Sequence, residues 1–257
     1  MASRAARSSD GPRLIGLGQW VSRYWDALRW NVPYWPVMVY NVVLWLLLPG
    51  RKLYEPEDVP GCEVLADNWQ VIREELDDLL RSQQPIPAFQ EVDPGQRRLT
   101  DDDGWKSFLF RLYGADVNTN RERCPKTAHV LDEVPGLYTA FFSILEPYKR
   151  IPIHSGPLKG LIRYHLPLIV PDGGECWIEI GGEVHHWREG EPLIFDDTYL
   201  HRVRNDTDQH RVVFFIDIER PMPWPWLQRL NRWVLGRMTR SRRIQNAVAN
   251  AARAAEG

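Results

Sequence analysis

Hydrophobic residues recur with two different periods along the chain, and the period changes near residue 137. Between residues 67 and 82, apolar side chains recur at steps of three and four, as they do on one face of an α-helix. This stripe consists of Trp69, Ile72, Leu76, Leu79 and Leu80. The pattern also predicts a strand over residues 105–113 and a short helix over residues 127–133.

From residue 137 onwards, short runs of strand-forming residues alternate with turn-forming residues. The runs predict seven strands, over residues 138–145, 161–170, 176–180, 183–187, 192–195, 200–204 and 211–218. Short, evenly spaced strands without intervening helices are typical of an antiparallel sandwich or barrel. We therefore expect a mainly β fold, a double-stranded β-helix (jelly roll), with a helical N-terminal layer that supports one sheet.

An uncharged, aromatic segment precedes the predicted fold. No residue between Arg29 and Arg51 is charged, and residues 30–50 match the length of ~20 residues that spans a bilayer. Pro33 and Pro36 weaken a spanning helix, whereas the many tryptophans and tyrosines are typical of a membrane interface. The segment favours membrane association, and the alternative is a helix packed against the core.

The C-terminal part is strongly basic, although the whole chain has a formal net charge of only −2. From Arg220 to the end there are eight arginines and one acid, Glu256. Over residues 224–244, one helical face collects Leu227, Leu230, Trp233, Val234 and Met238, and other faces carry Arg229, Arg232, Arg240 and Arg243. A basic amphipathic helix is typical of attachment to an anionic membrane surface, and the alternative is a helix packed on the body with solvated arginines.

These patterns divide the chain into three parts. Residues 1–60 form a leader with the aromatic membrane-associated segment, residues 61–220 the jelly-roll domain with its helical support, and residues 221–257 the basic amphipathic helix. The sequence contains no recognisable nucleic-acid module, so we expect no nucleic acid as partner. Its three cysteines are widely separated, which argues against disulfides and favours a cytoplasmic protein, associated with the inner face of a membrane.

Histidines gather in the predicted jelly roll. Six of the seven lie there: His154, His165, His185, His186, His201 and His210. Neutral imidazole is a common ligand of iron, copper and zinc, so a barrel mouth lined with histidines favours a metal site. For any single histidine, a buried and hydrogen-bonded structural role is the alternative.

Several motifs follow one another between residues 100 and 220. They are Phe142-Ser143-Ile144-Leu145, His154-Ser155-Gly156-Pro157, Arg163-Tyr164-His165-Leu166 and Phe195-Asp196-Asp197, followed by His201 and Arg211. This series resembles the aspartyl/asparaginyl β-hydroxylase family of Fe(II)/2-oxoglutarate dioxygenases. The stretches Trp105-Lys106-Ser107-Phe108, Leu112-Tyr113-Gly114 and Cys124-Pro125-Lys126-Thr127 resemble its bacterial lipid A hydroxylase branch in particular.

The resemblance implies an iron site with two protein ligands, His154 and His201, which would be the catalytic metal ligands. Most of the wider oxygenase superfamily has an acidic ligand two residues after the first histidine, where this chain has Gly156. That position would be left to water or to a halide. Asp196 and Asp197 are expected to be structural, tying the turn before His201 to backbone amides or to a histidine near the metal.

The resemblance also implies a cosubstrate site. Arg211 would bind the distal carboxylate of 2-oxoglutarate, with the Ser143 hydroxyl as its partner. Arg163 and His165 lie two residues apart, hence on one face of their strand, and would hold the C1 carboxylate end.

The function implied is that of an Fe(II)/2-oxoglutarate-dependent hydroxylase that uses O2. The lipid-branch motifs and the two terminal segments favour the acyl chain of a membrane lipid as its substrate. Two alternatives remain, a β-hydroxylase acting on Asp or Asn in a peptide or small molecule, and a catalytically silent jelly-roll binding module.

Overall fold

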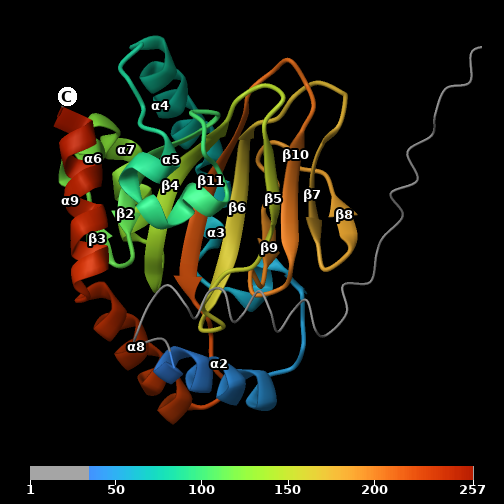
Figure 1. Ribbon diagram of the computed structural model, residues 1–257, viewed down its shortest axis with the longest axis vertical. Helices are drawn as coiled ribbons and strands as arrows, with labels where there is room; N and C mark the ends of the chain where they lie inside the picture. Colours follow the sequence, from blue (N-terminus) through green and yellow to red (C-terminus); the bar gives the residue numbers. More distant parts are fainter. Residues whose placement is uncertain (1–34, 257) are drawn as a thin grey trace, which may run out of the picture.

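The computed structural model describes residues 35–256, so the predicted leader up to residue 34, including residues 30–34 of the aromatic segment, lies outside the described residues. Within this range, antiparallel strands form two sheets that pack face to face (Figure 1). The larger sheet has the strand order β1-β9-β6-β11-β4-β2-β3, and the smaller one the order β5-β10-β7-β8. This arrangement confirms the predicted mainly β fold, a double-stranded β-helix with added helices.

The bounds of the elements are as follows. The strands are β1 Leu53–Tyr54, β2 Trp105–Leu112, β3 Ala115–Asp116, β4 Leu137–Leu145, β5 Arg150–His154, β6 Leu161–Ile169, β7 Cys176–Ile180, β8 Glu183–His185, β9 Leu193–Phe195, β10 His201–Asn205 and β11 Arg211–Glu219. The helices are α2 Trp35–Leu47, η1 Pro56–Asp58, α3 Glu63–Asp67, α4 Trp69–Arg81, α5 Phe89–Val92, η2 Pro94–Arg98, α6 Asn118–Arg123, α7 Pro125–Asp132, α8 Pro225–Thr239 and α9 Arg242–Glu256.

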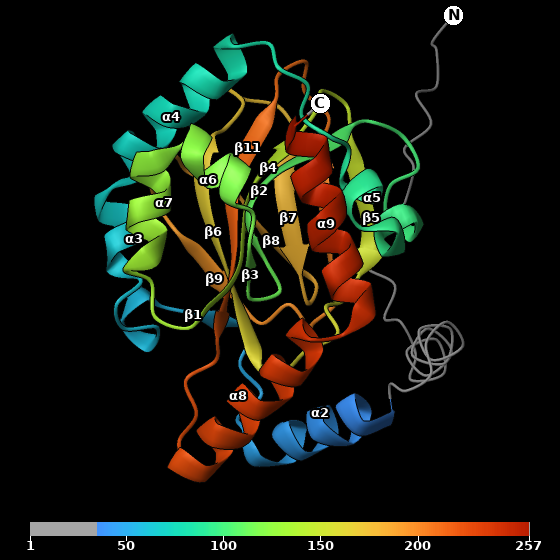
Figure 2. The same cartoon turned by 90° about the vertical axis from the view of Figure 1, so that its left-hand side faces the viewer.

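Three central strands, β4, β6 and β11, separate two cores because side chains alternate between the faces of a sheet. One face lies under helices α3, α4 and α7 (Figure 2). The strands supply to it Phe142, Ile144, Ile162, Tyr164, Leu166, Val212, Phe214 and Ile216. The opposite face borders the space between the sheets, where Phe141 and Val213 belong to one cluster with Ile178 and Ile180 of β7. This inner face also carries the polar residues of the candidate site.

The structure confirms most of the elements that the periodicity predicts. The helix over residues 67–82 corresponds to α4, and the strands after residue 137 correspond to β4 and β6–β11. Strand β5 is not predicted, because it is short and Pro152 interrupts its run of strand-forming residues.

The prediction of one amphipathic helix over residues 224–244 is wrong. The segment contains two helices, α8 and α9, which are separated near Ser241. The Ser241 hydroxyl accepts a hydrogen bond from the Ile244 backbone N–H at 3.4 Å, so it caps the start of α9. Trp233 also departs from prediction, since it is 64% exposed and lies outside the buried face of α8.

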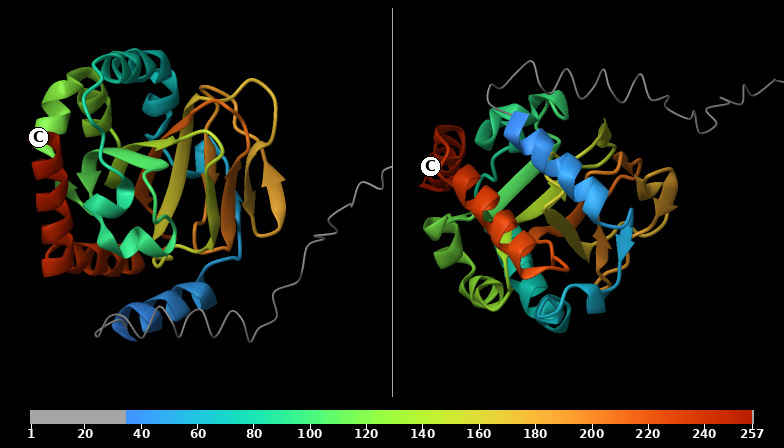
Figure 3. Two further views of the ribbon diagram at one scale, coloured as in Figure 1. Left: turned by 45° about the horizontal axis from the view of Figure 1, so that its top comes forward. Right: turned by 90° about the horizontal axis from the view of Figure 1, so that it is seen from below.

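Helices α2 and α8 lie side by side across one end of the barrel (Figures 1 and 3). Their facing side chains form one cluster that includes Tyr40, Leu44, Leu48, Leu227 and Val234. Part of the predicted aromatic segment therefore packs as a helix on the fold, while its other face stays exposed. No helix within residues 35–256 has both the length and the apolar character that crossing a bilayer requires.

The two helices hold the loop that joins β5 to β6. The Asn41 side chain donates to the Pro157 carbonyl at 2.7 Å and accepts from the Lys159 backbone N–H at 3.0 Å. From α8, the Asn231 side chain donates to the Gly160 carbonyl at 3.0 Å. A Cβ on Gly160 would lie 2.2 Å from Asn231 Oδ1 and 2.3 Å from the Tyr40 hydroxyl, so only glycine fits this junction.

We predict that Gly160→Ala destabilises the fold by about 1–3 kcal/mol, because the added methyl forces α2 and α8 away from the loop. The measurement is the free energy of unfolding from denaturant titration. Gly236→Ala is the matched control, since a Cβ at this α8 position meets no atom within 4 Å. We expect the control to stabilise by about 0.5–1 kcal/mol through helix propensity. Equal effects of both substitutions would contradict the tight junction.

Candidate active site

Two predicted metal ligands, His154 and His201, lie opposite each other on neighbouring strands. The end of β5 pairs with the start of β10 in this register, and the centroids of the two imidazole rings are 4.1 Å apart. Each Nδ1 lies close to the carbonyl oxygen two residues earlier, at 2.8 Å from Pro152 and 2.9 Å from Tyr199. Because a carbonyl only accepts, each Nδ1 carries the proton and each Nε2 keeps a free lone pair.

Both imidazoles are neutral at physiological pH. Burial lowers the pKa of His154 to about 4, and burial together with the neighbouring His154 lowers the pKa of His201 well below its usual value. A neutral ring with a free Nε2 is the form that binds a metal. Within residues 35–256, no group of three or more histidine, cysteine or acidic side chains is arranged to hold a metal ion.

The predicted cosubstrate residues share the interior face of the larger sheet. Ser143 comes from β4, Arg163 and His165 from β6, and Arg211 from the start of β11. The His165 ring lies 5.4 Å from the ring of Phe215, an inward residue of β11. The structure therefore brings all four residues into the space between the sheets, and Arg163 and His165 share a face as their two-residue spacing predicts.

Arg211 is the most unusual of these residues, because its guanidinium is buried without a counter-charge from the described part of the chain. The side chain is 1% exposed, and no acidic group among the described residues pairs with it. Its Nη1 approaches the Ser143 carbonyl at 3.5 Å, its guanidinium lies 4.8 Å from the centroid of the Trp187 ring, and its Nε has no hydrogen-bond partner. Burial lowers its pKa to about 10, so the group stays charged at neutral pH.

Further unsatisfied polar atoms surround Arg211. Both ring nitrogens of the buried His165 and the Trp187 indole N–H lack hydrogen-bond partners in the described structure. Burial, then the charges of Arg163 and Arg211, lower the pKa of His165, so its ring is uncharged. Unpaired buried polar groups are costly, and several around one cation are typical of a binding site for a polar anion.

Ser143 differs in detail from its predicted role. Its hydroxyl accepts a hydrogen bond from the Trp105 indole N–H at 2.9 Å, whereas its carbonyl contacts Arg211. The predicted hydroxyl–guanidinium pair is therefore absent from the described contacts. Trp105 stands in a lipid-branch motif, but nothing in its spacing from Ser143 indicates this contact.

Arg163 is paired with two carboxylates inside the barrel. Its guanidinium lies 2.8 Å from Asp197 and 3.0 Å from Asp217, and it stacks over the Phe215 ring at 4.1 Å. Burial raises the pKa of Asp197, although the charge of Arg163 acts in the opposite direction. A ligand carboxylate that reaches Arg163 would therefore share it with these acids.

Asp197 also explains the glycine at position 156. The Gly156 backbone N–H donates to the Asp197 carbonyl at 2.7 Å. A Cβ on residue 156 would lie 1.8 Å from the Asp197 carboxylate oxygen Oδ2, so this carboxylate occupies the space where an acidic ligand side chain would begin. Sequence spacing does not indicate this contact, because 40 positions separate the two residues.

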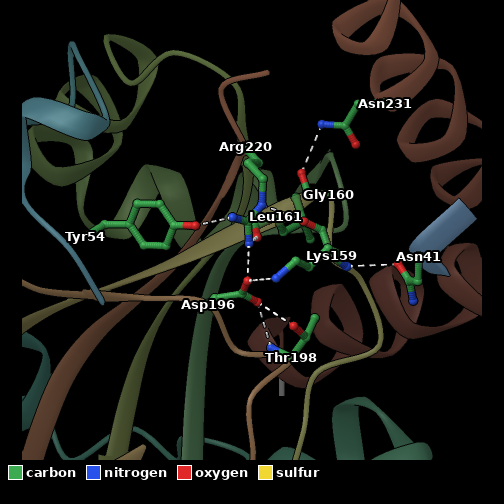
Figure 4. A network of polar contacts seen from close by, with 9 residues as sticks. All are labelled: Asn41, Tyr54, Lys159, Gly160, Leu161, Asp196, Thr198, Arg220 and Asn231. Atoms are coloured by element: carbon green, nitrogen blue, oxygen red, sulfur yellow. Dashed lines mark hydrogen bonds and ion pairs between the residues drawn. The ribbon is translucent and has the colours of Figure 1, made fainter. Parts of the chain in front are cut away.

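The neighbouring Asp196 belongs to a second buried charge network (Figure 4). Its carboxylate pairs with Lys159 and with Arg220, the latter at 2.7 Å, and it accepts hydrogen bonds from the Thr198 backbone N–H and hydroxyl. Lys159 is fully buried, and its ammonium lies 3.6 Å from the centroid of the Trp45 ring on α2. As predicted, Asp196 ties the turn before β10 to a backbone amide, but its two cationic partners are not predicted.

The chain was compared with known proteins. The family model for aspartyl/asparaginyl β-hydroxylase matches residues 66–221. The ornithine lipid ester-linked acyl 2-hydroxylase of Rhizobium tropici is 38% identical over 184 residues, which cover 71% of this chain and 65% of that protein. The human aspartyl/asparaginyl beta-hydroxylase is 30% identical over 170 residues, which cover 64% of this chain and 22% of that protein. The match thus spans less than two thirds of the length of either relative.

Among solved structures, a Pseudomonas putida prolyl-4-hydroxylase matches with a TM-score of 0.38 and 13% identity, covering 60% of this chain and 88% of that one. The family match includes every motif from Phe142 to Arg211 and confirms the resemblance that these motifs carry. The chain belongs to the aspartyl/asparaginyl β-hydroxylase family.

Proposed function

We propose that this protein is an Fe(II)/2-oxoglutarate-dependent dioxygenase that hydroxylates an unactivated C–H bond on the acyl chain of a membrane lipid. The observation that carries the proposal is the buried guanidinium of Arg211, which has no carboxylate partner among the described residues. The unsatisfied nitrogens of His165 and Trp187 lie in the same interior. A dicarboxylate would satisfy these groups together, so the residues present fit 2-oxoglutarate.

His154 and His201 would hold the iron through Nε2, because Nδ1 of each ring is committed to a backbone carbonyl. Their lowered pKa values remove proton competition at neutral pH. Iron(II) and 2-oxoglutarate, when bound, supply O2 activation and removal of a hydrogen atom from the substrate carbon. The Asp197 carboxylate fills the space beside Gly156, and glycine has no side chain, so residue 156 contributes no ligand.

Arg211 would bind the distal carboxylate of 2-oxoglutarate through a planar guanidinium that stays charged. Trp187 adds an unused N–H donor beside it, and Ser143 supplies a carbonyl that fixes the guanidinium. His165 and Arg163 would hold the C1 carboxylate end. Because Arg163 already pairs with Asp197, its charge would be shared between Asp197 and the bound carboxylate. The aromatic rings around His165 exclude water from this part of the site.

Two observations support a lipid substrate. The relative from Rhizobium tropici is named for acyl hydroxylation of an ornithine lipid. Exposed apolar side chains of α2 and α8 lie at the end of the barrel where the loop after the His154 strand, β5, contacts α2. A place at the inner face of a cytoplasmic membrane would bring the enzyme to such a substrate. Hydroxylation of Asp or Asn, the activity in the name of the human relative, is the alternative.

The proposed function predicts a gain of one oxygen in cellular lipids. Mass spectrometry of lipid extracts from cells with and without the gene should reveal an acyl chain that carries one additional oxygen only when the protein is present. His154→Ala and His201→Ala should each abolish this product while the protein stays folded, because either change leaves a single metal ligand. Unchanged lipids together with turnover of Asp- or Asn-containing peptides would favour the alternative substrate.

A spectroscopic measurement separates the enzyme from a silent binding module. Anaerobic addition of Fe(II) and 2-oxoglutarate to the purified protein should produce the weak visible absorption band of the metal–cosubstrate chelate. Loss of that band in His201→Ala serves as the control for specific binding. A wild-type protein without the band would contradict the proposed cofactor site.

Arg211→Met should raise the apparent KM for 2-oxoglutarate by roughly 30-fold or more, the equivalent of at least about 2 kcal/mol for losing a buried charged pair. Without cosubstrate, the same variant should unfold at a higher temperature than the wild type, because it removes a buried unpaired charge. Arg211→Lys should recover only part of the affinity, since it lacks the planar fork. Arg202→Met, on the exposed surface of β10, is the control. An unchanged KM for 2-oxoglutarate in Arg211→Met would indicate that Arg163, and not Arg211, binds the distal carboxylate.

Gly156→Ala should destabilise the protein by about 1–3 kcal/mol and impair turnover, because its Cβ collides with the carboxylate of Asp197. Measuring unfolding free energies in a double-mutant cycle with Asp197→Ala tests this cause. In the Asp197→Ala background, where the space is open, the glycine substitution should cost little. Additive effects would contradict the steric explanation.

A further inference from the structure

Exposed apolar side chains are concentrated on two helices of this protein. Of the ten large hydrophobic residues that are exposed among the side chains described within residues 36–254, seven lie on α2 or at α8: Val39, Val42, Leu46, Leu47, Trp224, Trp226 and Trp233. The other three, Leu80, Tyr148 and Val184, are scattered singly. Leu46 alone is 81% exposed. Helix α2 contains no charged residue, so its exposed face is almost entirely apolar. A cluster of this kind on two packed helices indicates an interaction surface.

The exposed residues of each helix lie outside the face that packs on the rest of the protein. Each helix buries one face in a shared cluster, through Tyr40 and Leu44 on α2 and through Leu227 and Val234 on α8. The exposed residues follow helical steps on the opposite faces. Seen from below, both helices cross the underside of the barrel in front of the strands (Figure 3).

The charges of this surface are of one sign. Helix α2 contains no charged residue, and α8 contains arginines but no acid. Arg232 pairs with Glu219 at 3.0 Å, whereas no acid in the described part of the chain pairs with Arg229, Arg237 or Arg240. At 100° per residue these three arginines flank the tryptophans of α8. Tryptophan beside unpaired arginine on an apolar surface is complementary to the headgroup region of anionic lipids.

We propose that this surface docks onto an anionic lipid bilayer, with α2 and α8 lying in the plane of the interface. We call it the α2/α8 platform and define it by Val39, Val42, Leu46, Trp226 and Trp233 with Arg229, Arg237 and Arg240. A second copy of the chain fits less well, because a twofold contact would bring the α8 arginines of both copies together without acids between them. The proposal rests on the proposed function for its lipid substrate and adds the surface that brings the site to it.

The platform is adjacent to the histidine pair. Asn41 of α2 binds the Pro157 carbonyl, three residues after His154, and the Trp45 ring lies 5.4 Å from Tyr199, two residues before His201. Three residues span at most ~11 Å, and a helix adds ~10 Å, so the imidazoles lie within roughly 20 Å of the docked surface. Docking therefore holds the site near the headgroup end of a membrane lipid.

The test is sedimentation of the full-length protein, without iron or 2-oxoglutarate, with vesicles of phosphatidylcholine with or without phosphatidylglycerol. We expect the wild type to bind the anionic vesicles. Leu46→Gln/Trp233→Gln should weaken binding at least tenfold. Arg229→Gln/Arg237→Gln/Arg240→Gln should do so on anionic vesicles only, since each arginine near such a surface contributes about fivefold. Val184→Gln, which replaces a 50% exposed valine on β8 outside the platform, is the control and should bind like the wild type.

Thermal unfolding of each variant verifies that it is folded, so a loss of binding reports on the surface. Equal vesicle binding by the wild type and both platform variants would overturn the proposal and assign binding to another part of the chain, residues 1–34 included. A wild type that ignores vesicles but dimerises through Leu46 and Trp233 would overturn it in favour of a second copy. Because the assay needs no turnover, docking without lipid oxidation would refute the proposed function alone.

Discussion

Side chains two residues apart on a strand share a face, and in this protein that geometry determines both the core and the site. Along β6 the outward residues Ile162, Tyr164 and Leu166 pack under the helices, while Arg163 and His165 point between the sheets. The same repeat on β4 and β11 adds Ser143 and Arg211 to this interior. A one-residue slip of any of these strands would exchange apolar and polar rows, so packing the helical layer also sets the register of the site.

The interior charges form two clusters of opposite net charge, and the clusters meet at the consecutive residues Asp196 and Asp197. Asp196 binds two cations, Lys159 and Arg220, whereas Asp197 shares one cation, Arg163, with a second acid. Burial lowers the pKa of Lys159 and raises that of Asp197. Burial thus disfavours the charged forms that these ion pairs require. Losing one partner of such a buried group costs about 3–5 kcal/mol, which makes the turn before His201 rigid.

The charge of Arg211 differs from these clusters because no acidic group within residues 35–256 neutralises it. Stability within the fold would favour an acid nearby, as Asp196 and Asp197 provide elsewhere. The surrounding nitrogens of His165 and Trp187 are unsatisfied as well. These unsatisfied groups lie together, so an anionic ligand that binds there would gain free energy from all of them. The aromatic core under α3, α4 and α7 offsets the stability that the fold loses by burying them unpaired.

Periodicity was sufficient to predict the strands after residue 137, the helix α4 and the shared face of Arg163 and His165. It could not place Asp197 against Gly156 or Lys159 beneath α2, because those contacts join segments whose approach depends on the whole barrel. The sequence does carry a signal for the break between α8 and α9 at Ser241, because serine is a preferred helix cap. The pattern alone does not place Trp233, because an apolar residue fits a helical stripe whether that stripe faces the core or a lipid.

The rigid connection between the terminal helices and the barrel has a geometric consequence. A membrane anchor on a flexible linker would leave the barrel free to rotate, so the site would meet its substrate in many orientations. Here Asn41 and Asn231 bind the β5–β6 loop directly, and Lys159 joins that loop both to α2 and to the turn before β10. Whatever surface α2 and α8 rest on is therefore held at a fixed distance and angle from His154 and His201. On the proposed lipid substrate, orientation of this kind would select one carbon of the acyl chain by its depth in the bilayer, without any side chain having to recognise that carbon.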